Sequence, residues 1–344
     1  MASEAPPFWW GRSDWRAGLL YPLSAAYGFV ATHRLENARR EKTGVPVLCV
    51  GNLTVGGAGK TPVAIAMANQ ARAMGLTPGF LSRGHGGRLS SRPHLVDPAH
   101  DSARSTGDEP LLLARHALTA VSPDRAAAAR VLVGEGCDFL VMDDGFQSAR
   151  IHHDYALLVV DARRGIGNGH IIPGGPMRAP LIAQLRRADA VLKMGEGNGA
   201  DRVVRMASRA GRQVFEAVVR PMQGSGVEGK RLLAFAGIGD PEKFFATVAS
   251  AGGLVTVSRP FPDHHHYSDE DLADLLAQAK AAGLHLVTTA KDAVRIHHGS
   301  PVAEAVLAAL HVVEIETVFS PENVPEVIVE ATLEAFRMRS ERSR

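Results

Sequence analysis

The sequence is poor in cysteine and in net charge, and each shortage excludes a class of protein. Its two cysteines, Cys49 and Cys137, both lie in apolar runs. They indicate buried free thiols in a reducing compartment and exclude a disulfide framework or a cysteine metal site. A formal net charge of +2 is too small to indicate nucleic acid as the main partner.

Long hydrophobic runs are also missing. The apolar segment 17–31 has only fifteen residues and contains Pro22, whereas a membrane-spanning helix needs about 20 residues. The first residues lack a basic stretch that leads into an apolar core, so no cleavable signal sequence is expected and a cytoplasmic location is favoured. With 344 residues, the chain is long enough for two domains, each with its own core.

Aromatic residues make up only 6% of the chain, yet all three tryptophans (Trp9, Trp10 and Trp15) fall within the first fifteen residues. Apolar residues then recur at helical spacing up to Val30, with arginines on both sides. This pattern is typical of a helix that lies in a membrane interface, which we place within residues 1–40. A helix packed on the domain, with tryptophans as core fillers, explains the same pattern.

A glycine-rich segment follows the apolar run 45–50 and precedes a helix-compatible run. Gly56, Gly57 and Gly59 would let backbone N–H groups surround phosphate oxygens, Lys60 would reach the β- and γ-phosphates, and the Thr61 hydroxyl would bind Mg²⁺. A strand, a glycine-rich turn and a helix form the context of a phosphate-binding loop. The predicted nucleotide-binding residues are Thr54, Val55, Gly56, Gly57, Ala58, Gly59, Lys60 and Thr61. Thr54 stands where such loops usually have their first glycine.

Two acidic residues follow a later apolar strand, 139–142. Asp143 fits the acidic strand end that holds Mg²⁺ in phosphate-loop proteins, and Asp144 would bind the metal through water or orient a nucleophile. A plain Asp-Asp-Gly turn is the alternative. Another strand ends at Asp161, and ligands of parallel sheets bind at the carboxyl ends of the strands.

The order of strands and helices predicts an α/β fold of the phosphate-loop NTPase type: a mostly parallel sheet with helices on both faces, plus a smaller second α/β domain. We expect the nucleotide-binding domain at 41–212, an extended linker at 213–230 and the smaller domain at 231–338. The linker is placed where polar and apolar residues alternate before a glycine-rich stretch.

Three other features are ambiguous from the residues alone. Asp108 opens a helix, where an acid often only interacts with the helix dipole. His264 begins a run of three histidines, which is often a polar turn and makes a poor metal site. The segment 288–292 faintly resembles a guanine-reading turn, although a strand-to-helix cap explains it better.

Taken together, the motifs resemble the tetraacyldisaccharide 4'-kinases, the lipid A 4'-kinase family of Gram-negative bacteria. The resemblance extends from the N-terminal helix to about residue 335. The segments that carry it are 51–62, 82–84, 107–110, 143–147, 167–169, 173–178, 261–264 and 289–292. It implies transfer of the ATP γ-phosphate to the 4'-hydroxyl of a tetraacylated glucosamine disaccharide 1-phosphate, which yields lipid IVA. It also implies a peripheral protein on the cytoplasmic face of the inner membrane, with ATP and Mg²⁺ as cofactors.

The resemblance gives two ambiguous residues a role: Asp108 and His264 match the family's catalytic pair. Residues of the matched segments and their surroundings become candidates for holding phosphates or substrate, namely Arg83, Arg125, Gln147 and Arg178. The chain departs from the family pattern at His85, where the family commonly has Tyr, at Ala179, where it usually has Glu, and at Ala58, where it has Thr or Ser.

Two other functions also fit the phosphate loop. One is a cytosolic NTPase with a Gly-Gly-x-Gly-Lys-Thr loop, such as a metal-delivery GTPase or an ATP-dependent synthase. The other is a membrane-associated ATPase that transfers phosphate only to water. A catalytic base and a lipid-facing N-terminal helix favour the kinase over both.

Overall fold

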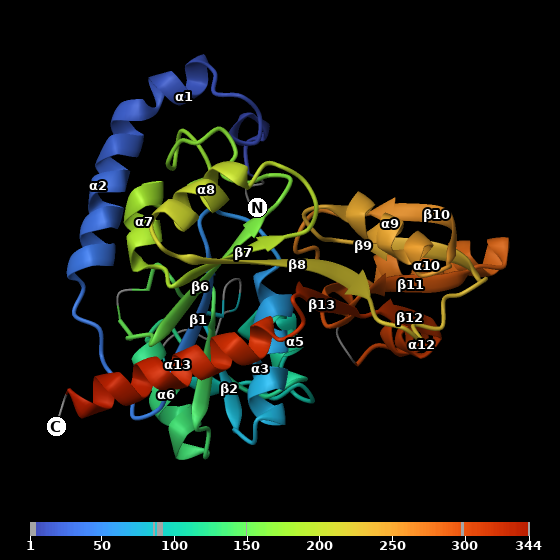
Figure 1. The fold of residues 1–344 in the computed structure, drawn as a ribbon. Coiled ribbons are helices and arrows are strands. Elements are labelled where there is room, and N and C mark those ends of the chain that lie inside the picture. Colours follow the sequence, from blue (N-terminus) through green and yellow to red (C-terminus); the bar gives the residue numbers. More distant parts are fainter. Residues whose placement is uncertain (1–4, 85–86, 88–91, 149, 297–298, 343–344) are drawn as a thin grey trace.

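The fold consists of a large and a small α/β unit that lie side by side, as the computed structural model shows (Figure 1). The structure describes residues 5–84, 87, 92–148, 150–296 and 299–342. His85, one of the departures from the family pattern, lies outside these ranges. The large unit carries the phosphate loop, and the small unit follows it in the chain.

The large unit is built on a nine-stranded sheet with the order β13-β8-β7-β6-β1-β5-β2-β4-β3. Neighbouring strands are parallel except at the two edges, where β13 pairs antiparallel with β8 and β3 pairs antiparallel with β4. The strands are β1 (Val47–Asn52), β2 (Pro78–Ser82), β3 (His94–Leu95), β4 (Leu118–Val121), β5 (Phe139–Asp143), β6 (Tyr155–Asp161), β7 (Ala190–Met194), β8 (Gln213–Pro221) and β13 (Ile315–Ser320). This confirms the predicted mostly parallel sheet.

Helices cover both faces of this sheet because successive residues of a buried strand point to opposite sides. In the central strand β1, Val47 and Cys49 pack in one core with α2, α6, α7 and α8, whereas Leu48 and Val50 pack in the other with α3, α5 and α13. Cys49 and Cys137 are buried free thiols, as predicted. The helices are α2 (Tyr21–Asn37), α3 (Lys60–Ala73), α4 (Ala103–Thr106), α5 (Asp108–Ala114), α6 (Arg125–Gly134), α7 (Leu181–Arg187), α8 (Asp201–Arg209) and α13 (Val324–Glu341).

The small unit is a four-stranded parallel sheet with the order β10-β9-β11-β12. Helices α10 and α12 pack on one face and α9 on the other, which gives the unit two cores of its own. Its elements are β9 (Arg231–Ala236), α9 (Pro241–Ser250), β10 (Leu254–Pro260), α10 (Asp269–Ala282), β11 (His285–Thr289), α11 (Ala290–Ala293), α12 (Pro301–Ala309) and β12 (Leu310–Val313).

The connection between the units differs from the expected linker at 213–230. Residues 213–221 form β8, which pairs with β7 and with β13 of the large sheet. Its alternation of polar and apolar residues reflects a strand near the sheet edge, half-buried along its length. The small unit also ends earlier than residue 338, because β13 and α13 return to the large unit. The chain therefore crosses between the units twice (Figure 1).

The N-terminal segment lies along one side of the large unit. A short 3₁₀ turn (Pro7–Trp9) and α1 (Trp15–Leu19) lead into α2. Ser24 anchors α2, since its Oγ donates to the carbonyl of Ile171 (2.8 Å) and accepts from the N–H of Gly174 (3.0 Å). Trp9 is buried, and its indole N–H donates to the carbonyl of Pro173 (3.0 Å). Trp9 is thus a core filler, the second of the two interpretations.

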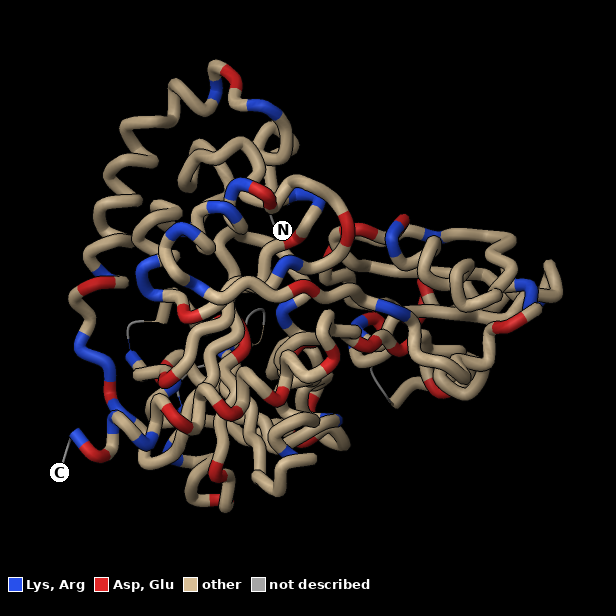
Figure 2. Tube along the Cα trace, in the orientation of Figure 1, with Lys and Arg blue, Asp and Glu red and all other residues tan. Residues whose placement is uncertain are grey.

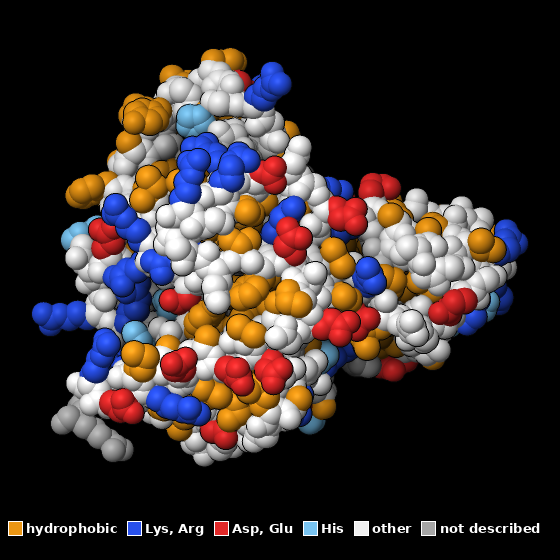
Figure 3. All heavy atoms as spheres, viewed as in Figure 1, with side chains coloured by type: hydrophobic (Ala, Val, Ile, Leu, Met, Phe, Trp, Pro, Cys, Tyr) orange, Lys and Arg blue, Asp and Glu red, His pale blue; other side chains and the backbone are white. Residues whose placement is uncertain are grey.

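The outer side of this segment is apolar and exposed. Side chains of α1 and α2 that remain largely uncovered include Trp15 (74% exposed), Leu19 (72%) and Phe29 (76%). Figure 3 shows these hydrophobic side chains gathered over α1 and α2, at the upper left of the view. Among the described residues, no helix is long and apolar enough to cross a membrane.

The close contact between β1 and the turn after β5 yields a stability prediction. A Cβ added at Gly51 would lie 2.5 Å from the Cβ of Phe146, which is buried, whereas a Cβ at Gly44 would meet nothing within 4 Å. Gly51→Ala is expected to lower the free energy of unfolding by about 1–3 kcal/mol, as overpacking of a core does. Gly44→Ala should stay within about 0.5 kcal/mol of the parent. Urea unfolding followed by circular dichroism compares them, and equal midpoints for both variants would contradict the packing.

Candidate active site

The loop between β1 and α3 has the geometry of an anion cradle. Gly56 and Gly59 adopt left-handed φ angles of 93° and 82°, which glycine reaches without steric cost. No side chain caps the N-terminus of α3, so its first amides remain available to a phosphate. The loop is held from outside by two hydrogen bonds: Val55 N–H donates to Pro176 O (2.9 Å) and Arg178 Nε to Thr54 O (3.0 Å). Thr54 thus serves as an anchor through its carbonyl.

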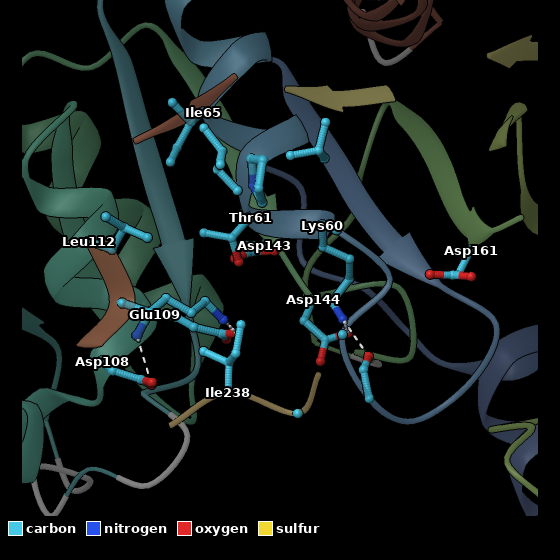
Figure 4. Close-up of a pocket in the computed structure, with 18 of the residues that line it drawn as sticks. Lys60, Thr61, Ile65, Asp108, Glu109, Leu112, Asp143, Asp144, Asp161 and Ile238 are labelled. Carbon is cyan, nitrogen blue, oxygen red and sulfur yellow. Dashed lines mark hydrogen bonds and ion pairs between the residues drawn. The ribbon is translucent and has the colours of Figure 1, made fainter. Parts of the chain in front are cut away.

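Lys60 and Thr61 point from the first turn of α3 toward the two aspartates after β5 (Figure 4). Lys60 Nζ lies 3.4 Å from Gly56 O and 3.8 Å from Asp144 Oδ1. The Thr61 hydroxyl donates to Asp143 Oδ2 (3.0 Å). Asp161 ends the neighbouring strand β6, but its Oδ1 accepts the N–H groups of Arg163 (2.8 Å) and Arg164 (2.9 Å).

Asp143 has the character of a metal ligand. It is buried, and its Oδ1 has no hydrogen-bond partner. Burial raises the pKa of Asp143 to about 7, and the charge of Glu109 adds to the shift. An orphaned carboxylate oxygen beside a threonine hydroxyl suits Mg²⁺, which takes oxygen ligands from one or two side chains and completes its shell with phosphates and waters. Among the described residues, no three or more His, Cys, Asp or Glu side chains form a group that could hold a metal ion.

Asp144 has the opposite environment. Arg178 holds it through two bonds, Nη1 to Oδ1 (2.7 Å) and Nη2 to Oδ2 (2.9 Å). Burial opposes ionisation, but Lys60 and Arg178 lower the pKa of Asp144 to about 2. Arg125 donates to the carbonyl of Asp144 (3.0 Å), and Gln147 accepts from Arg178 (3.0 Å). Of the four predicted phosphate or substrate residues, Arg178 and Arg125 thus bind Asp144 directly, and Gln147 binds Arg178.

Asp108 and His264 meet across the two units. Asp108 begins α5, and its Oδ2 accepts a hydrogen bond from His264 Nδ1 (3.1 Å). His264 adopts a left-handed φ of 59°, which is uncommon for a residue with a side chain. Burial works against the charge of Asp108, but the hydrogen bond from His264 and the charge of Arg295 hold its pKa far below the usual range. The same hydrogen bond raises the pKa of His264.

Arg295 is a residue that sequence reasoning missed. It is only 4% exposed, and its guanidinium donates to Asp108 through Nε (2.9 Å) and Nη2, and to Asp292 Oδ1 (2.9 Å). Asp292 also accepts from the hydroxyl of Tyr267 (2.9 Å). The signal available in the sequence was an arginine three residues after Asp292, between apolar neighbours. The expected helix cap at 288–292 is confirmed, because Thr289 caps α11.

Lys291 was missed as well. Its Nζ lies 2.7 Å from Oε1 of Glu109. The carboxylate of Glu109 opposes the effect of burial and raises the pKa of Lys291, while Lys291 in turn lowers the pKa of Glu109. Two consecutive acids of α5 are therefore each neutralised by a base from the small unit.

A single cleft of about 2810 Å³ contains these groups. It is lined by the phosphate loop, by both aspartates after β5, by Asp108 and His264, and by Ile238 and Phe244 of the small unit. It also extends to Tyr27 and Arg34 of α2. Arg83, the fourth predicted phosphate holder, is exposed and lines the same cleft. An anion cradle, a metal position and a carboxylate–imidazole pair in one cleft are the parts required for phosphoryl transfer.

Comparisons with known proteins agree on one family. The family model for Tetraacyldisaccharide-1-P 4'-kinase matches residues 16–333. The chain is 61% identical to the tetraacyldisaccharide 4'-kinase of Mesorhizobium japonicum, over all of both chains, and 56% identical to that of Chelativorans sp., over 98% of each. Its fold is similar to that of LpxK from Aquifex aeolicus, solved in complex with ATP, with a TM-score of 0.71 and 23% identity over 92% of this chain and 99% of the other. The predicted fold class is thereby confirmed.

The orphaned oxygen of Asp143 generates a test of the metal position. Asp143→Asn keeps the shape of the side chain but removes the charge, and we expect Mg²⁺ to bind roughly 10- to 100-fold more weakly in the presence of ATP. Asp161→Asn is the matched control, since Asp161 ends β6, on the other side of β1, and lines the same cleft. Isothermal titration of Mg²⁺ into the protein with nucleotide measures both. A loss in the Asp161 variant with none in the Asp143 variant would place the metal elsewhere.

The buried guanidinium of Arg295 generates a stability prediction. Arg295→Met leaves Asp108 and Asp292 buried without their cation, and is expected to lower the free energy of unfolding by about 3–5 kcal/mol at pH 7. The pKa of Asp108 is lower in the folded protein than in the unfolded chain. The ionised carboxylate therefore adds to the free energy of unfolding above the unfolded pKa of about 3.9, and this contribution is lost as the pH falls through the pKa of the folded protein. The deficit of the variant should therefore shrink below about pH 4. Arg231→Met, at an exposed arginine, is the control, and an equal loss in both variants would disprove the assignment.

Proposed function

The chain belongs to the Tetraacyldisaccharide-1-P 4'-kinase family, and we propose that it transfers the γ-phosphate of ATP to the 4'-hydroxyl of tetraacyldisaccharide 1-phosphate. The observation that carries this proposal is the continuous cleft, which joins the phosphate loop to the Asp108–His264 pair and to α2. A lipid acceptor can thus reach the nucleotide from the apolar side of the molecule. A cytosolic NTPase would need neither the exposed apolar helix nor the pair.

The phosphate loop is the proposed ATP site. Its backbone amides and Lys60 hold the β- and γ-phosphates, while Asp144 and Arg178 fix the position of Lys60 from the other side. We had expected Asp144 to contact the metal or a nucleophile; its two bonds to Arg178 favour a positioning role. Thr61 and Asp143 would hold Mg²⁺, which supplies neutralisation of the phosphate charge when bound.

The Asp108–His264 pair is the proposed acceptor site. A sugar hydroxyl is a weak nucleophile, and loose phosphoryl transfer depends mainly on in-line positioning and on removal of the hydroxyl proton as the bond forms. Asp108 stays ionised in the folded protein and is aligned by Arg295, and His264 is half-exposed to the cleft. The pair would orient the 4'-hydroxyl and accept its proton.

Arg83 is the proposed holder of a substrate phosphate, since it is exposed at the cleft while Arg125, Arg178 and Gln147 bind within the protein. Those three would act by keeping Asp144 and the loop in place. Ala179, where the family usually has Glu, is fully buried.

The N-terminal segment is the proposed membrane contact. The exposed apolar side chains of α1 and α2 form a surface that suits the interface of a bilayer, and Tyr27 and Arg34 of α2 line the cleft as well. A protein bound in this way would act as a peripheral enzyme on the cytoplasmic face of the inner membrane, where its lipid acceptor lies.

The proposal predicts that purified protein with Mg²⁺-ATP phosphorylates the lipid disaccharide 1-phosphate in detergent. Asp108→Asn and His264→Ala are expected to lower kcat by about 10²- to 10⁴-fold, the usual contribution of acid–base catalysis, with little change in ATP affinity. His265→Ala is the matched control, because His265 pairs with Asp271 instead. Radiolabelled ATP separates the outcomes. Hydrolysis of ATP without labelled lipid would disprove the kinase activity, and normal turnover in both variants would exclude a catalytic role for Asp108 and His264.

A further inference from the structure

Helix α8 presents a row of arginines to solvent. Arg202, Arg205 and Arg209 are all exposed and recur at helical spacing, while Val203 and Ala207 on the opposite side are buried. Among the described residues, none of the three arginines has a carboxylate partner within ion-pair distance. Like charges three or four residues apart destabilise a helix. Arg209 lies in the last turn, where the helix dipole favours a cation, whereas Arg202 and Arg205 lie three residues apart and repel each other without an ion pair in return.

The row continues onto the neighbouring helix α7. Arg186 and Arg187 are exposed at its end, and Ile182, one turn earlier, is 56% exposed. Helices α7 and α8 together carry five arginines and one acid, Asp201, which gives 5 − 1 = +4, whereas the whole chain has only +2. The positive charge is thus concentrated on these helices.

This arginine face (Arg186, Arg187, Arg202, Arg205 and Arg209) adjoins the apolar surface of α1 and α2. Helix α7 packs against both α2 and α8, and Arg187 donates to the carbonyl of Glu36 in α2 (2.6 Å). Figure 2 shows blue positions along α7 and α8, and Figure 3 shows their side chains beside the hydrophobic side chains of α1 and α2. An exposed apolar surface bordered by cations is the pattern of a protein that rests on a charged bilayer.

We propose that the arginine face binds the anionic headgroups of a lipid bilayer, beside the apolar contact of α1 and α2. The planar guanidinium suits phosphate oxygens because it donates two hydrogen bonds at once. Apolar contact would give affinity for any bilayer, and the arginine face would add selectivity for negative lipids. The inference rests on the proposed membrane contact of α1 and α2, and extends it to helices that carry no apolar surface of that size.

Co-sedimentation with vesicles tests the proposal on the full chain. Arg205→Glu/Arg209→Glu is compared with Arg231→Glu/Lys280→Glu, which makes the same charge change at exposed positions of the small unit. Each basic residue near an anionic surface strengthens binding about fivefold, so the first variant should lose roughly 25-fold or more on vesicles with phosphatidylglycerol. It should bind phosphatidylcholine vesicles like the parent. The preference of the parent for anionic vesicles should fade at high salt.

A third variant separates this inference from the proposed function. Leu19→Ser/Phe29→Ser removes exposed apolar side chains of α1 and α2, and should weaken binding to both kinds of vesicle. In detergent, the arginine variant is expected to have the same kinase activity as the parent. If the parent itself had no kinase activity, the proposed function would be refuted, but the vesicle result would still test the arginine face. Unchanged binding of the arginine variant to anionic vesicles, or no vesicle binding by the parent, would overturn the inference.

Discussion

The site depends on the buried ion pair between Asp108 and Arg295, which joins the two units. Each ion loses several kcal/mol of hydration on burial, so the pair adds little net stability. Its effect is positional: Asp108 of the large unit contacts both Arg295 and His264 of the small unit, and these contacts tie the two units to each other. The same placement brings Lys291 to Glu109. We infer that the small unit serves the site chiefly by fixing the carboxylate that faces the acceptor.

The neighbouring carboxylates Asp143 and Asp144 show how environment divides two roles between identical side chains. Asp143 lies at the end of β5 without a cation in contact, and its pKa is raised. Asp144, one residue later in a left-handed conformation, turns toward Lys60 and Arg178, and its pKa is lowered. Asp143 therefore keeps one oxygen without a hydrogen bond, which suits the proposed metal, while Asp144 is neutralised by two cations. Sequence analysis assigns Asp143 to the metal and Asp144 to a water-mediated metal contact or a nucleophile. It could not find the bond from Arg178 to Asp144, because the two residues are 34 positions apart.

Features that depend on one short segment could be predicted from the sequence, whereas contacts between distant segments could not. Short segments predicted the phosphate loop, the acidic strand end and the thiols at Cys49 and Cys137. The contact between Thr61 and Asp143 then followed from the parallel sheet, which brings the ends of β1 and β5 together. Arg295 could not be found in this way, since its partner Asp108 is 187 residues away. The role of β8 was missed for the same reason: the strand pairs with β7 on one side, and on the other with β13, which follows the whole small unit in the chain.

The position of α2 bears on how the proposed lipid acceptor would enter the cleft. The phosphate loop opens at the carboxyl edge of the large sheet, and the small unit covers it from one side. Tyr27 and Arg34 of α2 also line the cleft, and α2 carries part of the exposed apolar surface. A nucleotide is water-soluble and can enter from any open side, whereas a lipid acceptor cannot leave the bilayer without exposing its acyl chains. Under the proposed function the cleft would have to open toward the membrane, and an apolar surface bordered by arginines beside Tyr27 and Arg34 is the arrangement that would place it there.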